Sequence, residues 1–131
     1  MSTTSKTILV ADDESHILHV VSLKLRNAGY RVVTARDGAE ALEMAQNEKP
    51  DLLITDYHMP QLSGLELCQR LKRDANTSSI PAIMLTARGY QLEPHDTEKS
   101  GILCMLSKPF SPRHLLTTVN EVLEGKIEKA A

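Results

Sequence analysis

The sequence lacks an excess of positive charge. Its 131 residues include 15 lysines and arginines against 17 aspartates and glutamates, which gives a formal net charge of −2. A protein that binds nucleic acid through the phosphate backbone needs a clustered basic surface. The charge balance therefore gives no support for a nucleic-acid partner, and we expect none.

Cysteine is scarce, and its two copies lie far apart. Cys68 and Cys104 fall outside any Cys-x-x-Cys or Cys/His ligand spacing. Neither a disulfide framework nor a zinc site is therefore indicated. We expect both residues to be buried thiols in a reducing compartment.

Long apolar runs and a targeting segment are also missing. No run approaches the ~20 apolar residues that a membrane-spanning helix needs. The opening "MSTTSKT" has neither the basic start nor the apolar stretch of a signal peptide. We therefore expect a soluble, cytoplasmic protein without a membrane partner. Its length fits a single domain over residues 1–131, with a core at about 6–125 and flexible ends at 1–5 and 126–131.

What the sequence does contain is a regular alternation of short apolar runs with segments of helical periodicity. The runs are too short for typical helices and mostly too apolar for half-exposed strands, so they are predicted to be buried parallel strands. They lie at residues 6–11, 30–35, 51–56, 80–87 and 102–107.

The first and last helical segments have recognisable ends. Ser15 is the predicted N-cap of the first helix, which stops at Gly29. Ser111 is the predicted N-cap of the last helix, with Pro112 at its first position and Gly125 at its end.

The segments between them are less uniform. Helices are predicted over about 39–48 and about 65–74, the latter with three inward-facing residues, Leu65, Cys68 and Leu71. Residues 88–101 have few apolar positions, and Pro94 lies in their middle. Because an interior proline costs a helix ~3 kcal/mol, the fourth helix is expected to be short or irregular.

Five strand–helix repeats predict an α/β fold whose parallel sheet is covered by helices on both faces. For five strands, the doubly wound order 2-1-3-4-5 of the flavodoxin-like fold is the economical arrangement, whereas a barrel would need eight repeats. In this order the chain reverses between strands 1 and 3. The functional cleft is therefore predicted where those two strands end.

Acidic residues end the two strands that flank this cleft. Asp12 and Asp13 follow the first strand, and Asp56 ends the third. Such carboxylates repel one another at close range. A Mg²⁺ ion held by carboxylate, carbonyl and water oxygens would supply the positive charge that offsets this repulsion. Thr86 and Lys108 end the fourth and fifth strands and are predicted to face the same rim. Helix capping explains the Asp pair alone, but not the whole set.

This set of side chains suits phosphoryl transfer to a carboxylate. An aspartate can attack phosphorus and carry an aspartyl phosphate. Mg²⁺ and a lysine would neutralise negative charge on the oxygens of the transferred phosphoryl group, and a hydroxyl would complete the set of groups that bind it. Asp56 is the predicted nucleophile because it stands alone at its strand end, which leaves Asp12 and Asp13 to hold the metal.

Five motifs carry a resemblance to a known family, in order and over essentially the whole chain: "LVADDES", "YRVVTARDGAEAL", "PDLLITDYHMPQLSGLEL", "IPAIMLTA" and "SKPF". Together they resemble the receiver domain of two-component response regulators, in particular single-domain regulators of the chemotaxis type. The resemblance implies a signalling module rather than an enzyme, since it would catalyse only its own phosphorylation and dephosphorylation.

The resemblance also implies roles for individual residues. Asp56 would be the phosphoacceptor and, with Asp13, a direct Mg²⁺ ligand; Asp12 would bind through water, and the backbone carbonyl of His58 would be a further ligand. Thr86 and Lys108 would hold the phosphoryl group. The Lys108–Pro109 peptide would be cis, an isomer that proline makes accessible.

Partners follow from the same resemblance. The phosphoryl group would come from a phosphohistidine on a sensor histidine kinase or a phosphotransfer protein. A downstream protein would bind the face formed by the fourth helix, the fifth strand and the last helix.

Two features depart from the usual pattern of the family. Met105 stands where most receivers have an aromatic residue, so coupled rotation of a ring with Thr86 is not available. His58 and Arg88 lie two residues after Asp56 and Thr86, where a bulky pair could shield the phosphoryl group from water.

Other functions remain open at this point. The chain could be the excised receiver of a larger regulator or hybrid kinase, although the initial Met and the polar ends favour a stand-alone receiver. A Mg²⁺-dependent aspartyl-phosphate phosphohydrolase of the haloacid-dehalogenase type would need an Asp-x-Asp pair and a cap domain. A flavodoxin-like nucleotide binder would need a glycine-rich or hydroxyl-rich loop after the first strand, where "ADDES" places carboxylates instead.

Overall fold

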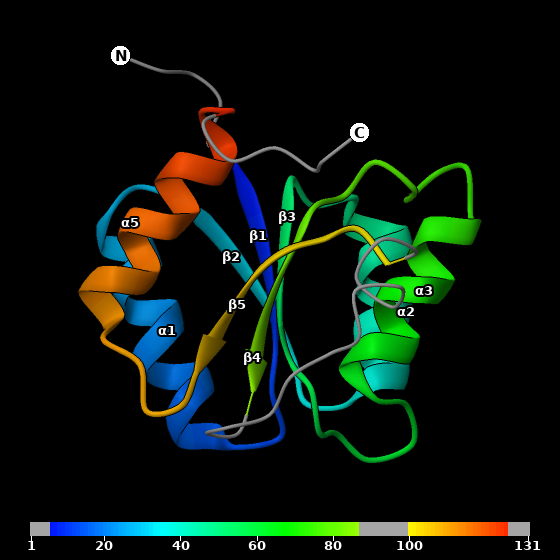
Figure 1. Ribbon diagram of the computed structural model, residues 1–131, viewed down its shortest axis with the longest axis horizontal. Coiled ribbons are helices and arrows are strands. Elements are labelled where there is room, and N and C mark those ends of the chain that lie inside the picture. Colours follow the sequence, from blue (N-terminus) through cyan, green and yellow to red (C-terminus); the bar gives the residue numbers. More distant parts are fainter. Residues whose placement is uncertain (1–5, 87–99, 126–131) are drawn as a thin grey trace.

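The computed structural model describes residues 6–86 and 100–125 and contains five strands and four helices within them (Figure 1). The strands are β1 (Thr7–Ala11), β2 (Arg31–Ala35), β3 (Leu52–Asp56), β4 (Ala82–Thr86) and β5 (Ile102–Ser107). The helices are α1 (Ser15–Asn27), α2 (Gly38–Glu48), α3 (Gly64–Arg73) and α5 (Pro112–Leu123). The predicted irregular fourth helix falls almost entirely outside the described residues, as do the predicted flexible ends.

The strands form one sheet in the order β2-β1-β3-β4-β5, and all of its pairings are parallel. Helices α1 and α5 cover one face of the sheet, and α2 and α3 cover the other (Figure 1). The predicted doubly wound, flavodoxin-like α/β fold is therefore confirmed, including its strand order. None of the described helices is long and apolar enough to span a bilayer.

The sheet divides the hydrophobic core into two layers. Alternate residues of a strand face opposite sides, so Ile8 and Val10 pack with residues of α1 and α5, while Leu9 and Ala11 pack with residues of α2 and α3. Every residue of β3 and β4 is buried. Because both strands are covered on both faces of the sheet, the residues at their ends are held in fixed positions.

Two helix ends differ in how well the sequence predicted them. Ser111 caps α5 as predicted, since its side chain accepts a hydrogen bond from the backbone N–H of His114. The prediction for Ser15 was wrong, because Ser15 is the first residue of α1 and Glu14 occupies the N-cap. The Ser15 hydroxyl instead accepts a hydrogen bond from Arg36, with an Nη2–Oγ distance of 2.9 Å.

Helix α3 presents a slightly different face from the predicted one. Cys68 and Leu71 are buried as expected, but Leu67 is fully buried while Leu65 is only partly so. The helix starts at Gly64, where a Cβ atom would lie 2.2 Å from the carbonyl oxygen of Asp56. Glycine at this position lets the chain return tightly against the end of β3.

Strand β5 forms an edge of the sheet and is less buried than the three central strands β1, β3 and β4. Ile102 is buried, whereas the four residues from Leu103 to Leu106 are only partly covered. The prediction that Cys104 is a buried core thiol is therefore only partly right, because this residue is half-buried while Cys68 is fully buried.

Candidate functional site

The carboxyl ends of four strands meet at one edge of the sheet, and each carries a polar residue. Asp12 directly follows β1, Asp56 ends β3, Thr86 ends β4, and Lys108 directly follows β5. Among the described residues, carboxylate oxygens of Asp12, Asp13 and Asp56 all lie within 4.8 Å of one another. The topology thus brings residues that are up to 96 positions apart in the chain into one cluster.

The three aspartates differ sharply in their exposure. Asp12 is completely buried and Asp56 is 6% exposed, whereas Asp13 is exposed. Burial disfavours the charged form of a carboxyl. Burial accordingly raises the pKa of Asp56 to about 6, with a further contribution from the charge of Asp12 and an opposing one from Lys108. Burial also raises the pKa of Asp12, although the backbone N–H of Glu14 and the charge of Lys108 oppose it.

Lys108 is the cation of the cluster. Its Nζ lies 3.1 Å from Oδ2 of Asp12, 3.4 Å from Oδ1 of Asp56 and 2.9 Å from Oε1 of Glu14. Burial opposes protonation of the lysine, but the hydrogen bond to Glu14 and the charges of Asp12 and Asp56 outweigh it and raise its pKa. The lysine therefore remains a fixed positive charge beside the buried carboxylates.

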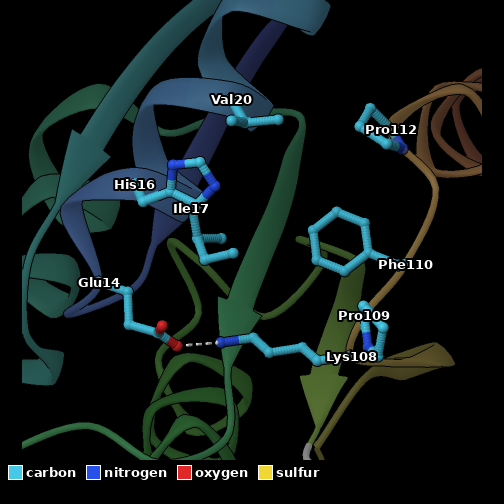
Figure 2. Close-up of a pocket in the computed structure, with 8 residues that line it drawn as sticks. All are labelled: Glu14, His16, Ile17, Val20, Lys108, Pro109, Phe110 and Pro112. Atoms are coloured by element: carbon cyan, nitrogen blue, oxygen red, sulfur yellow. Dashed lines mark hydrogen bonds and ion pairs between the residues drawn. The ribbon is translucent and has the colours of Figure 1, made fainter.

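Glu14 was given no role by the sequence analysis. It directly follows the Asp pair, yet its side chain reaches across to Lys108 (Figure 2). Hydrogen bonding to Lys108 and the lysine's charge lower the pKa of Glu14. Its presence at the same strand end as Asp12 and Asp13 was visible in the sequence, but the direction of its side chain was not.

Thr86 lies fully buried at the end of β4, and its hydroxyl oxygen has no hydrogen-bond partner among the described residues. A buried hydroxyl without a partner costs free energy that is recovered when an acceptor arrives. The backbone carbonyl of Thr86 is engaged, because it accepts a hydrogen bond of 2.8 Å from the N–H of Lys108. Thr86 and Lys108 are thus held next to each other.

The remaining predicted positions lie around this cluster. His58 is exposed in the loop after β3, with its ring packed edge-on against Tyr57. The predicted cis peptide between Lys108 and Pro109 is present. Met105 is partly buried and packs on the α2/α3 side of the sheet, while Arg88 lies outside the described residues.

Comparisons with known proteins agree on one family. The sequence profile of the response regulator receiver domain matches residues 8–120. The chain is 41% identical over 118 residues to the phosphate regulon regulatory protein PhoB of Pseudomonas aeruginosa, covering 90% of this chain and 52% of PhoB. It is 33% identical to the protein PilH of the same organism, covering 90% of this chain and 98% of PilH. The chain therefore spans about half the length of relatives such as PhoB and nearly all of PilH.

Solved structures give the same result. The chemotaxis response regulator CheY4 of Vibrio cholerae superposes with a TM-score of 0.83 at 35% identity, over 91% of this chain and 99% of that one. The receiver domain of the sensor histidine kinase PA1611 from Pseudomonas aeruginosa, which holds a magnesium ion in its active-site cleft, gives 0.82 at 26% identity, over 92% and 99%. The chain belongs to the response regulator receiver domain family, whose members are phosphoacceptors in two-component signalling.

Proposed function

We propose that Asp56 is the residue that accepts the phosphoryl group. The observation that carries this proposal is its position: a buried carboxylate at the end of a central strand, within 4.8 Å of the carboxylates of Asp12 and Asp13 and 3.4 Å from the ammonium of Lys108. Asp12 is fully buried and already accepts hydrogen bonds from Glu14 N–H and from Lys108. Asp56 lies farther from Lys108, at 3.4 Å against 3.1 Å for Asp12, so its oxygens are held less tightly and are the better nucleophile.

The transfer step uses groups that the structure places at the site. A carboxylate oxygen of Asp56 forms a bond to phosphorus while the bond from phosphorus to the donor's nitrogen breaks, and the donor imidazole keeps that electron pair. Lys108 offsets the negative charge on the phosphoryl oxygens. The Thr86 hydroxyl, which has no acceptor at rest among the described residues, donates to one of them.

The residues present fit a Mg²⁺ ion. The ion prefers hard oxygen ligands, and the three carboxylates offer such atoms within 4.8 Å of one another. Asp13 and Asp56 would bind it directly, Asp12 through water, and the backbone carbonyl of His58 would complete the protein ligands. When bound, the ion would neutralise charge on the phosphoryl oxygens.

The phosphoryl donor that we propose is a phosphohistidine on a sensor histidine kinase or a phosphotransfer protein. A downstream protein is proposed to bind at the fourth helix, β5 and α5. The partly covered apolar residues of β5 support this, because an exposed apolar sheet edge is a surface to which a partner can bind. We also propose that residues 1–131 form a single receiver domain and that its location is cytoplasmic. Its proposed role is signalling rather than enzymatic.

Intact-mass analysis after incubation with Mg²⁺ and acetyl phosphate tests the acceptor. A hydroxylamine-labile phosphoryl adduct is expected on the wild type and not on Asp56→Asn. Asp51→Asn is the matched control, because Asp51 is an exposed carboxylate just before the opposite end of the same strand. An adduct on Asp56→Asn, or its absence from the wild type when a known receiver is modified in parallel, would refute the assignment.

A further inference from the structure

Lys108 makes its shortest ion pair with Glu14 rather than with the proposed acceptor. Its Nζ lies 2.9 Å from Oε1 of Glu14, 3.1 Å from Oδ2 of Asp12 and 3.4 Å from Oδ1 of Asp56. A lysine ammonium has three protons to donate. Because three carboxylates surround it, a phosphoryl oxygen can gain a direct bond to Lys108 only if one of them yields its place.

The local backbone explains why Glu14 points at the lysine. Glu14 is the N-cap of α1, but its side chain makes no capping hydrogen bond. Its backbone N–H donates instead to Oδ1 of Asp12 over 2.9 Å, which fixes the turn between β1 and α1. The Glu14 side chain is left free to reach across the site to Lys108.

Of the three carboxylates, Glu14 is the one that can be released cheaply. The Glu14 side chain is 59% exposed, whereas that of Asp12 is completely buried. A carboxylate released into water regains its hydration, while an unpaired buried carboxylate does not. Glu14 also borders a cavity of about 470 Å³ lined by Ile17, Val20, Phe110 and Pro112, at one end of which it meets Lys108 (Figure 2). The side chain therefore has room to swing away.

We propose that Glu14 is a positioning residue that holds Lys108 in a resting state and must release it when the phosphoryl group arrives. This inference rests on the proposed function. In the resting protein the pair keeps the lysine partly withdrawn from Asp56. On transfer, the phosphoryl oxygens take the place of the Glu14 carboxylate on the ammonium. Glu14 thereby slows phosphorylation and sets how readily the site responds to its donor.

The charge of Glu14 acts in the same direction. Four carboxylates, those of Asp12, Asp13, Glu14 and Asp56, lie at this site, and Lys108 contacts three of them: Asp12, Glu14 and Asp56. An incoming phosphodonor is itself an anion, and like charges repel. Removing the charge of Glu14 lowers this repulsion and frees one donor position of Lys108 in a single change.

The experiment compares the rate of adduct formation with acetyl phosphate at saturating Mg²⁺ in four proteins. Glu14→Gln removes the charge, and Glu14→Ser also supplies a favourable helix N-cap. Glu43→Gln is the control: it changes the net charge equally, and Glu43 is exposed on α2. Because exposed ion pairs are weak, both Glu14 variants are expected to react about 2- to 5-fold faster than the wild type, with Glu43→Gln unchanged.

Several outcomes would overturn the inference. One is that Glu14→Gln and Glu14→Ser react no faster than the wild type; another is that Glu43→Gln accelerates as much as they do. A Mg²⁺ titration is part of the test, because faster reaction that disappears at saturating Mg²⁺ would show an effect on the metal instead of on Lys108. If the wild type itself forms no adduct, the proposed function is refuted, and so is this inference, because it rests on that function.

Discussion

Replacing Asp56 with asparagine is expected to stabilise the metal-free protein at neutral pH, although it removes the proposed acceptor. Burial raises the pKa of Asp56 from 3.8 to about 6. Each pKa unit corresponds to about 1.4 kcal/mol of difference between the two protonation states. Keeping this carboxylate ionised in the folded protein therefore costs about 3 kcal/mol at pH 7.5, and Asp56→Asn removes that cost.

The gain should depend on pH in a defined direction. A carboxyl with a higher pKa in the folded than in the unfolded state favours folding when it is protonated. This contribution is fully present below about pH 4 and is lost as the pH rises through about 6. The stability difference between Asp56→Asn and the wild type should accordingly fall from about 3 kcal/mol at pH 7.5 to about 1 kcal/mol at pH 4.5.

Urea unfolding followed by circular dichroism, in the presence of a chelator and at several pH values, measures this difference. Asp51→Asn again serves as the control, and it should show no comparable gain because Asp51 is exposed. The reasoning fails if Asp56→Asn is no more stable than the wild type at pH 7.5. It also fails if the gain does not shrink on acidification, since the cause would then lie outside the ionisation of Asp56.

Three further predictions concern the surroundings of Asp56. Mg²⁺ at about 100 times its dissociation constant should stabilise the wild type by about 2.7 kcal/mol, and Asp13→Asn should lose most of this gain in thermal melts with and without the ion. Gly64→Ala should destabilise the fold by about 1–3 kcal/mol in urea, because its Cβ would lie 2.2 Å from the Asp56 carbonyl oxygen; an unchanged midpoint would contradict that close approach. Thr86→Val should change stability by less than about 1 kcal/mol, since the hydroxyl has no partner at rest among the described residues, but should slow adduct formation. A loss above about 2 kcal/mol would instead reveal a structural role for the hydroxyl.

The sequence was sufficient to predict where the main chain goes. Short apolar runs with helical segments between them admit one economical arrangement, and the strand order follows from it. Residues at strand ends are then placed by topology alone, which is why Asp12, Asp56, Thr86 and Lys108 could be grouped although they are distant in the chain. Their positions required no knowledge of side-chain packing.

Side-chain direction and burial could not be predicted in the same way. Asp12 and Asp13 are neighbours of identical chemistry, yet one is fully buried and the other exposed. The turn after β1 decides this, because the Asp12 carboxylate accepts the backbone N–H of Glu14. The same turn makes Glu14 rather than Ser15 the N-cap of α1 and sends the Glu14 side chain towards Lys108.

The resting site is best understood as a competition of carboxylates for too little positive charge. Lys108 contacts three of them, and its charge is not enough to keep the pKa of Asp56 from rising to about 6. Protonation, a bound cation, or removal of one carboxylate would each relieve the repulsion. Because these remedies act on the same charge imbalance, their effects should not add: Asp56→Asn should reduce both the stabilisation by Mg²⁺ and the stabilisation by acid. If Asp56→Asn kept the full stabilisation by Mg²⁺ or the full stabilisation by acid, the carboxylates would be shown to act independently.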